Sequence, residues 1–399
     1  MASVAFDNMR AFVILLVVAF HSALAYLASL PPSPYPFNDP PYLWHVFPII
    51  DQQRFIGFDL FCAWMDIFVI SLLYFLSGLF VWPSLKRKGS GLFLRHRLLR
   101  LGLPFVVVVG CLVPLAHYAT YRASAVDPSF VVFWRQWIAL PFWPSGPPWF
   151  LWLLLVFNAA AAALYKLAPG CGDSVARSLT ADTRPILCFA VLSSASAIAY
   201  VPLALAFSPW AWFEYGPFAF QLSRPAHYVL YFFVGVGVGA YGIEHGLFAA
   251  KGRLAQGWIG WLAAALALFL LWMSLTALAL RDTAATPLGV RVGADLSFSL
   301  ACAASCFAVV AVFLCFATRR VPVIESLADN AYGVYLVHYV FVLWLQYALL
   351  DAPLPAVAKF MIVLGLALLL SLAATTALQR IPAVARVIGT DRRAGAKAR

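Results

Sequence analysis

A histidine and an arginine stand out in the first apolar stretch of the chain, FDNMRAFVILLVVAFHSALAYLASL, residues 6–30. Arg10 and His21 are eleven residues apart. On a helix this is about three turns plus roughly 20°, so both side chains lie on one face, about 16 Å apart along the axis. Ionisable groups in hydrocarbon are costly and usually mark a functional site or an internal pairing. The spacing favours a cation at a membrane surface and a base near mid-depth. The alternative for His21 is a histidine hydrogen-bonded between packed helices.

The composition places the whole chain in a membrane. Hydrophobic residues make up 64% of the 399 residues and charged residues 11%, against about 45–50% and 25% in a soluble domain. The net charge of +11 could suggest nucleic-acid binding, but the basic residues lie in the short connections between apolar runs, as in membrane proteins. We therefore expect a polytopic membrane protein without a nucleic-acid partner. The seven cysteines lack metal-ligand spacing and are expected to pack as small apolar residues, and we expect no metal.

The apolar runs predict an all-α fold of about ten transmembrane helices in one bundle. The expected spans lie near 11–30, 59–82, 101–121, 149–167, 186–207, 227–244, 258–280, 295–317, 332–350 and 356–379. Residues 1–380 then form a single transmembrane domain, and 381–399 form a basic tail. With both termini in the cytoplasm, 20 of the 27 Lys and Arg residues lie on the cytoplasmic side, including those of a loop at 83–100. This bias predicts the orientation.

A cleaved signal peptide is an alternative interpretation of the first span. Residues 11–20 could form its apolar core, with Ala23-Leu24-Ala25 as a small-residue cleavage site. The apolar run, however, continues to Leu30, and Pro31-Pro32 ends it where a full span would end. We therefore expect a membrane span here.

A second group of cations leads into the third expected span. Arg97 and Arg100 are three residues apart, on one helix face, where the apolar run begins. Together with Arg10, and with Asp7 holding one guanidinium in place, they would form a floor that binds phosphate, because the planar fork of Arg suits phosphate oxygens. A simple positive-inside anchor is the alternative.

Six short motifs follow one another along the chain. They are Arg10 and His21 with ten residues between them, Phe75-Leu76-Ser77-Gly78, Arg97-Leu98-Leu99-Arg100, Trp149-Phe150-Leu151, Phe232-Phe233-Val234-Gly235, and Tyr332-Gly333-Val334-Tyr335-Leu336-Val337-His338. Each alone is weak. In this order they resemble the motifs of the acyltransferase 3 family of bacterial membrane acyltransferases, over nearly the whole chain.

The resemblance implies transfer of an acyl group from cytosolic acyl-coenzyme A to a hydroxyl of an extracytoplasmic glycan or other envelope acceptor, in a bacterial cytoplasmic membrane. It implies that His21 and Arg10 are essential, and it leans toward the branch that succinylates periplasmic glucans. Asp66 departs from the family pattern, because it lies eleven residues before Ser77, so we assign it no role. No fused extracytoplasmic hydrolase-like domain is expected.

The chemistry of a thioester donor fits this distribution of side chains. Arg10, Arg97 and Arg100, with Asp7, are the expected binding residues for the phosphates of coenzyme A. His21 is the expected general base, taking a proton from the acceptor hydroxyl. An acyl-histidine intermediate is the alternative mechanism.

Aromatic side chains are dense in two expected outer segments, 134–152 and 208–220. An interfacial aromatic belt explains most of them. A sugar-stacking platform is the sharper interpretation, with Trp149 as its ring and Glu214 and Arg224 as hydroxyl contacts. Tyr335 and His338, one turn apart, are further candidate substrate-binding residues, although His338 is equally consistent with a buried, hydrogen-bonded side chain.

The sequence therefore predicts an integral-membrane O-acyltransferase that uses acyl-coenzyme A. Two other functions remain open at this stage. A proton-coupled transporter would use His21 as a proton relay, and a non-enzymatic scaffold of an envelope assembly would tolerate its loss.

Overall fold

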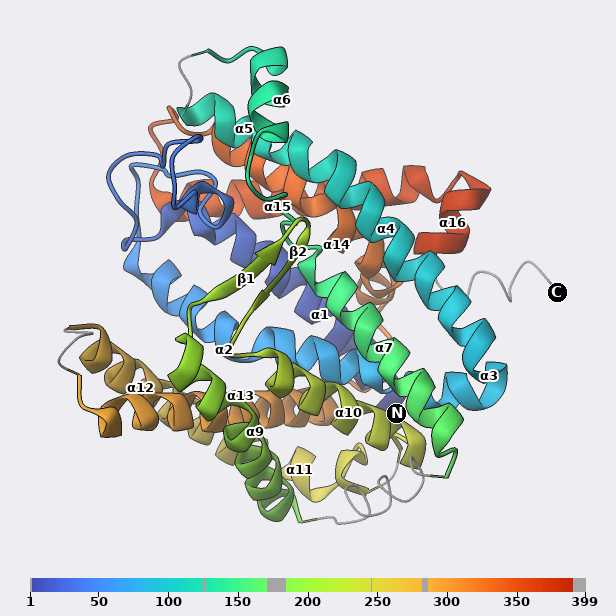
Figure 1. Ribbon diagram of the computed structural model, residues 1–399. Coiled ribbons are helices and arrows are strands. Elements are labelled where there is room, and N and C mark those ends of the chain that lie inside the picture. The colour runs from blue at the N-terminus through green and yellow to red at the C-terminus, as the bar shows by residue number, and fades with distance from the viewer. Residues whose placement is uncertain (1, 125–126, 171–183, 245, 282–285, 390–399) are drawn as a thin grey trace.

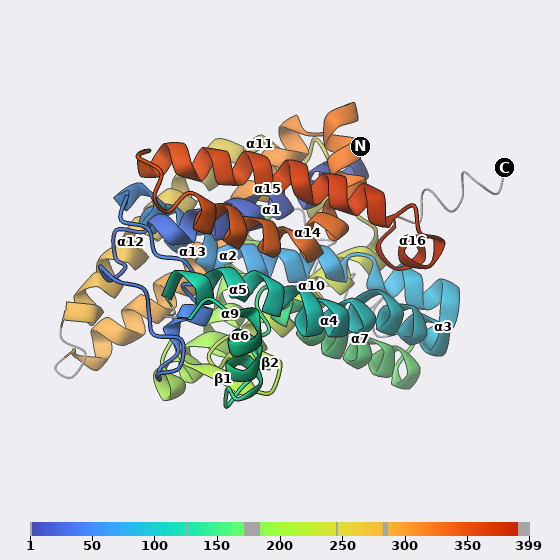
Figure 2. The same cartoon turned by 90° about the horizontal axis from the view of Figure 1, so that it is seen from above.

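The computed structural model describes residues 2–124, 127–170, 184–244, 246–281 and 286–389. It is 76% helical with almost no strands, so the predicted all-α membrane fold is confirmed. Figures 1 and 2 show long helices packed around α1 and α2, with α14 and α15 on one side and α13 on the other.

Eight helical stretches in the described part of the chain are long and apolar enough to cross a membrane. They are α1 (Ala2–Ala23) with the turn after it, α2 (Ile56–Gly78), the run from α3 to α5 (Val81–Ser124), α7 (Trp149–Leu167), α9 (Pro185–Phe207), α12 (Trp258–Arg281), α13 (Leu288–Phe316) and α15 (Ala356–Leu378). The other two expected spans are helices as well. They are α10 (Pro225–Tyr241), which has only 17 residues, and α14 (Pro322–Ala348), whose first turns are polar. The expected count of ten spans is not confirmed.

The first helix begins and ends earlier than the expected span of 11–30. It ends at Ala23 and continues only as a short 3-10 turn, Leu24–Tyr26. The carbonyl groups at this end find partners outside the helix. The side-chain amide of Gln346 donates to the carbonyls of His21 and Ser22, at 2.9 and 3.2 Å. Because these last-turn carbonyls are satisfied, the helix can stop before Pro31.

The N-terminal end of α1 is held by Glu244, which follows α10. Its carboxylate accepts hydrogen bonds from the backbone N–H groups of Ser3 and Ala2, at 3.1 and 3.2 Å. The bond from Ser3 is the largest of the effects that lower the pKa of Glu244. A negative charge at this position also suits the helix dipole.

The expected loop conformation of residues 83–100 is wrong, because this segment is helical. Helix α3 (Val81–Arg97) passes through a π-helical turn, Leu98–Gly102, into α4 (Leu103–Val107), and a second such turn, Val108–Leu112, leads into α5 (Val113–Ser124). Leu, Lys and Arg favour helices, which explains the helical structure despite the charge. The path bends at Gly89, where φ is 72°, a conformation that glycine adopts readily.

Helices α1 and α14 run parallel and side by side through the centre of the molecule (Figures 1 and 2). Near one end, the side-chain amide of Asn8 donates to the carbonyls of Ala317 and Arg319, just before α14, at 2.8 and 3.1 Å. Near the other end, Gln346 of α14 binds the last turn of α1. This pairing brings together two sequence segments that lie more than 300 residues apart.

Helices α2 and α10 pack with their backbones in contact. A Cβ atom on Gly235 would lie 2.1 Å from the carbonyl oxygen of Phe75, and one on Gly78 would lie 2.2 Å from that of Phe232. Both distances are far below a van der Waals contact, so only glycine permits this crossing.

The segment between α1 and α2 is tied to the bundle by a buried ion pair. The Lys359 ammonium lies 2.7 Å from a carboxylate oxygen of Asp51, and each side chain is 1% exposed. Lys359 also donates to the carbonyl of Leu350, at 3.0 Å. Lys359 therefore has a packing role that a count of loop charges does not show.

A small β-hairpin, absent from the sequence-based expectation, forms in the aromatic segment 208–220 (Figure 1). Strand β1 (Trp212–Tyr215) pairs antiparallel with β2 (Phe218–Gln221), and Gly216 in the turn has a φ of 54°. The expected basic tail begins as the short helix α16 (Pro382–Ile388), and residues 390–399 lie outside the described residues. Two further short α-helices in the described residues are α6 (Phe130–Ile138) and α11 (Arg253–Gln256).

Candidate active site

His21 and His338 are in direct contact. The Nδ1 atom of His21 lies 3.3 Å from the Nε2 atom of His338, and the ring centroids are 5.1 Å apart. His21 is half-buried in the last turn of α1, whereas His338 of α14 is fully buried. The structure thus joins two residues that were separate candidates in the sequence.

Hydrogen bonding determines which ring nitrogens carry protons. Nδ1 of His21 is 2.8 Å from the carbonyl oxygen of Val17, and Nδ1 of His338 is 2.7 Å from that of Tyr335. A carbonyl oxygen only accepts, so both Nδ1 atoms must be donors. The Nε2 atom of neutral His338 then carries a lone pair and accepts from His21. The same reasoning leaves Nε2 of His21 unprotonated and able to act as a base.

Aromatic rings surround the imidazole of His21. The Phe20 ring lies edge to face at 5.3 Å, and the Tyr339 ring does so at 5.4 Å. Tyr339 in turn contacts the buried His117, with centroids 5.6 Å apart. These contacts restrict the orientation of the imidazole, as a precisely placed catalytic group requires.

Tyr335 joins α14 to the start of α7. Its hydroxyl donates to the carbonyl of Pro147, at 2.6 Å, and its backbone carbonyl accepts from His338. Trp149, two residues after Pro147, packs edge to face against Trp212 of the hairpin, with centroids 5.7 Å apart. Tyr335 and Trp149 therefore belong to a layer between His21 and the hairpin.

The predicted phosphate-binding arginines lie at the other end of α1, at the end of α3 and in the π-helical turn that follows α3. Arg10 has its guanidinium 4.0 Å from the Asp7 carboxylate and 4.8 Å from the centre of the Phe80 ring. Its side chain is 40% exposed, so it remains accessible to a ligand. The predicted pairing of Asp7 with Arg10 is thus present as a long contact.

Arg97 and Arg100 are half-buried at the point where α3 becomes π-helical. The Arg97 guanidinium stacks on the Phe93 ring at 5.0 Å. One Nη atom of Arg100 donates to the carbonyl of Gly389, at 2.8 Å, just after α16. The backbone carbonyl of Arg100 accepts from the hydroxyl of Tyr332. These contacts fix the α3 end of the site to α14 and α16.

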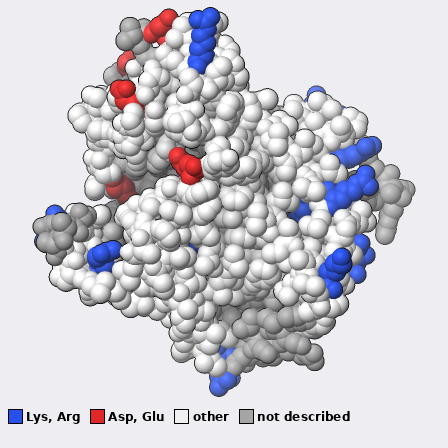
Figure 3. Space-filling view, in the orientation of Figure 1, with Lys and Arg blue, Asp and Glu red and all other residues white. Residues whose placement is uncertain are grey.

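Two contacts of α14 show how far apart the two ends of the site are. One is the arginine end, formed by Arg10, Arg97 and Arg100, and the other is the histidine pair, His21 and His338. Tyr332 contacts Arg100 and His338 contacts His21, and six residues correspond to about 9 Å of rise. Along α1, Arg10 and His21 are about 16 Å apart. Figure 3 shows that most of the visible Lys and Arg side chains lie toward the α3 side, whereas Asp and Glu lie toward the opposite side.

The two other predicted substrate contacts have protein partners. Arg224 makes a bidentate ion pair with Asp66, at 2.5 and 2.9 Å, and its guanidinium lies 5.0 Å from the Phe298 ring centre. Glu214 of the hairpin lies 3.1 Å from Nε2 of His45. Sequence reasoning gave Asp66 no role and missed His45. The pairing of Arg224 with Asp66 could have been suspected from the sequence, because each of these charged residues lies beside or within an apolar run, where charges usually need a partner.

A buried cluster around His227 was also missed. Its ring nitrogens lie 2.9 Å from the hydroxyl of Ser196 and 3.1 Å from that of Ser71, and the Cys302 sulfur lies 3.5 Å away. His227 is fully buried, so these contacts join α2, α9, α10 and α13 without access for a substrate.

Comparison with known protein families decides the class of this molecule. A family model described as an acyltransferase domain, that of acyltransferase 3, matches residues 3–376. The chain belongs to the acyltransferase 3 family. No curated protein and no solved structure matches the chain. Family membership identifies a membrane acyltransferase, which favours acyl transfer over the transporter and scaffold alternatives.

The family match also bears on the first helix of this acyltransferase. The matched region begins at residue 3 and so includes α1, whose residues Phe6, Met9, Val13 and Val18 are fully buried. The first helix therefore packs inside the matched domain. In the described residues no three His, Cys, Asp or Glu side chains lie close enough to hold a metal ion.

Proposed function

We propose that this acyltransferase moves an acyl group, acetyl or succinyl, from cytosolic acyl-coenzyme A to a hydroxyl of an extracytoplasmic glycan or other envelope acceptor. Its place would be a bacterial cytoplasmic membrane. The observation that carries the proposal is the contact between His21 and His338, which leaves Nε2 of His21 as a proton acceptor. Family membership supports the acyl-transfer chemistry.

His21 acts as a general base in this proposal. The acceptor oxygen attacks the thioester carbonyl carbon while Nε2 of His21 takes the hydroxyl proton. The C–S bond breaks as the ester C–O bond forms, and the imidazolium returns the proton to the departing thiolate. His338 is a positioning residue, because its Nε2 accepts from Nδ1–H of His21 and stabilises the positive ring, as the carbonyl of Val17 also does.

The arginine end would hold the donor. Arg10, Arg97 and Arg100 carry guanidinium groups suited to the phosphates of coenzyme A, and Asp7 orients Arg10. The separation of about 9–16 Å between these groups and the histidine pair suits a donor whose phosphates and thioester lie at opposite ends of a long chain. The donor would then enter from the side of α3.

The acceptor would enter from the hairpin side. Trp149 packs against the hairpin and offers an aromatic surface, and Glu214, with its side chain 28% exposed, offers a carboxylate to hydroxyl groups. Tyr335 supports this layer through Pro147. Arg224 would supply a guanidinium group that is held in place by its ion pair with Asp66. Donor and acceptor can then occupy the site together, which favours direct transfer.

Mass spectrometry of envelope glycans tests this function. Cells with the gene, cells without it and cells with His21→Gln are compared, and His96→Gln, at an exposed position, is the matched control. The proposal expects an ester that is present with the wild type and the control and absent in the other two. An unchanged set of esters after gene loss would refute it.

A further inference from the structure

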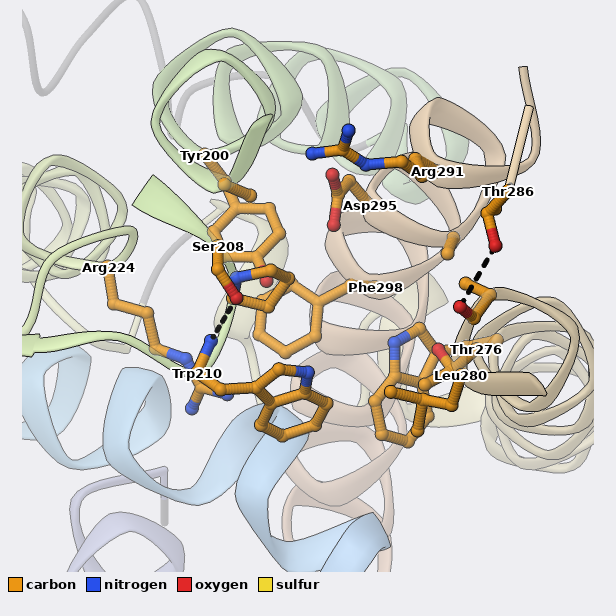
Figure 4. A pocket seen from close by; sticks show the side chains of 15 residues that line it. Tyr200, Ser208, Trp210, Arg224, Thr276, Leu280, Thr286, Arg291, Asp295 and Phe298 are labelled. Atoms are coloured by element: carbon orange, nitrogen blue, oxygen red, sulfur yellow. Dashed lines mark hydrogen bonds between the residues drawn. The ribbon is translucent and has the colours of Figure 1, made fainter. Parts of the chain in front are cut away.

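A cavity of about 290 Å³ lies away from the histidine pair, among the ends of α9, α12 and α13 and the segment before β1 (Figure 4). The polar side chains that line it include Asp295, Arg291, Arg224, Ser208, Thr276 and Thr286. Under the proposed orientation these helix ends face the outside. The cavity is therefore on the side from which an acceptor would arrive.

The charges in the cavity are balanced. Figure 4 shows the carboxylate of Asp295 beside the guanidinium of Arg291. Arg224 is paired with Asp66, at 2.5 Å, just outside the cavity. A site with two guanidiniums and two carboxylates favours neither an anion nor a cation. It suits a neutral ligand that can both donate and accept hydrogen bonds.

Two of these groups retain hydrogen-bonding capacity. The Nε atom of Arg224 is buried and has no partner among the described residues, although buried N–H groups are normally paired. Asp295 is only 6% exposed, and its side-chain oxygens have no hydrogen-bond donor among the residues that the structure describes. A ligand hydroxyl could satisfy each of them, donating to Asp295 and accepting from Arg224.

Aromatic rings form the rest of the wall. Tyr200 stacks on Phe298 with centroids 4.3 Å apart, and Trp272 lies 6.3 Å from Phe298. Trp210, 46% exposed, lies at the edge of the cavity. Ligand pockets combine such apolar walls with a few placed polar groups, and the cavity volume of about 290 Å³ is just below their usual range of about 300–1,000 Å³.

We propose that this cavity binds one neutral sugar unit of the acceptor, as an accessory site separate from His21 and His338. The hydroxyl groups of a sugar can form hydrogen bonds with the Asp295 carboxylate and the Arg224 guanidinium. The apolar faces of its ring can pack on the aromatic wall. The inference rests on the proposed function only in that the sugar is taken to belong to the acceptor. Binding at a remote unit would supply energy that orients the reacting hydroxyl.

The test is direct binding without any acyl donor. The purified full chain in lipid nanodiscs is titrated with the neutral tetrasaccharides maltotetraose, cellotetraose, laminaritetraose and mannotetraose, by saturation-transfer NMR. A second arm embeds the same sugars as glycolipid head groups, which separates a soluble acceptor from a lipid-linked one. Asp295→Asn and Trp210→Leu are compared with Asp351→Asn and Trp134→Leu, whose residues are exposed elsewhere on the molecule.

Binding of a tetrasaccharide that weakens about tenfold or more in Asp295→Asn and Trp210→Leu, but not in the controls, is the expected result. Trp210 is exposed, so its variant remains informative if Asp295→Asn does not fold. The proposal is overturned if no tetrasaccharide binds in either arm, if all variants bind equally, or if occupancy depends only on anionic phospholipid. Retained binding in His21→Gln, whatever its activity, separates this site from the proposed function.

Discussion

Nε2 of His338 lies 3.3 Å from Nδ1 of His21, and this contact joins α14 to the last turn of α1. Nδ1–H of His21 is shared with the backbone carbonyl of Val17, and Nδ1–H of His338 donates to that of Tyr335. Each proton of the pair therefore has one assigned place, and His21 keeps a free lone pair on Nε2.

The first prediction concerns His338. His338→Leu removes the acceptor for Nδ1–H of His21 and should lower kcat roughly fivefold, as expected for one lost hydrogen bond of about 1 kcal/mol, with KM for the donor nearly unchanged. His338→Gln keeps a carbonyl oxygen as acceptor and should recover part of the rate. Steady-state kinetics on both variants checks this. Equal rates for the two would mean that the acceptor at this position is unimportant.

The second prediction concerns donor binding. Arg97→Ala and Arg100→Ala should weaken binding of coenzyme A by about ten- to a hundredfold, as expected for one charge-assisted contact. Lys86→Ala, at an exposed position on α3, should have little effect because its charge is screened. Calorimetry with a non-hydrolysable thioester analogue measures all three. Equal, small effects would reduce the arginines to a topology anchor.

The third prediction concerns packing. Gly235→Ala should destabilise the protein by about 1–3 kcal/mol or more, because its Cβ would lie 2.1 Å from the carbonyl oxygen of Phe75. Gly260→Ala is the matched control, since a Cβ there meets nothing within 4 Å. Thermal unfolding in detergent compares them. If Gly235→Ala is as stable as Gly260→Ala, the close crossing of α2 and α10 is wrong.

The glycines at the close helix contacts illustrate what could be predicted from the sequence. Motif residues Gly78, Gly235 and Gly333 were recognised by order and resemblance alone, and the structure gives them a physical role. A Cβ on Gly333 would lie 2.2 Å from the Thr375 side chain. The span at 149–167 could be predicted because its apolar run matches α7 from end to end.

Other features depend on contacts between distant segments. The pair of Lys359 with Asp51 spans 308 positions, and no local pattern predicts it. The sequence could not decide whether His338 binds substrate or is a buried, hydrogen-bonded side chain. Its spacing from Tyr335 shows which helix face it lies on, but not which helix packs against that face. The hairpin was missed because its aromatic residues are equally typical of a membrane interface.

The fourth prediction concerns orientation, which rests on the 20 basic residues assigned to the cytoplasm. In a variant without native cysteines, Gly91→Cys should be protected in intact cells from a maleimide that cannot cross the membrane. Asp351→Cys, at the opposite side, should react. Both positions are exposed. Labelling at 91 in intact cells would exclude a cytosolic thioester as donor.

The most direct test of the central claim is a rapid-quench measurement with labelled acyl-coenzyme A. Wild type and His21→Gln are mixed with donor, and an envelope extract is added as acceptor in a second step. Direct general-base transfer predicts no label on the wild-type protein before the extract is added. After the addition, His21→Gln should transfer label about 10²- to 10⁴-fold more slowly while still binding donor. Label on the protein before the acceptor arrives, or an unchanged rate in His21→Gln, would contradict the account.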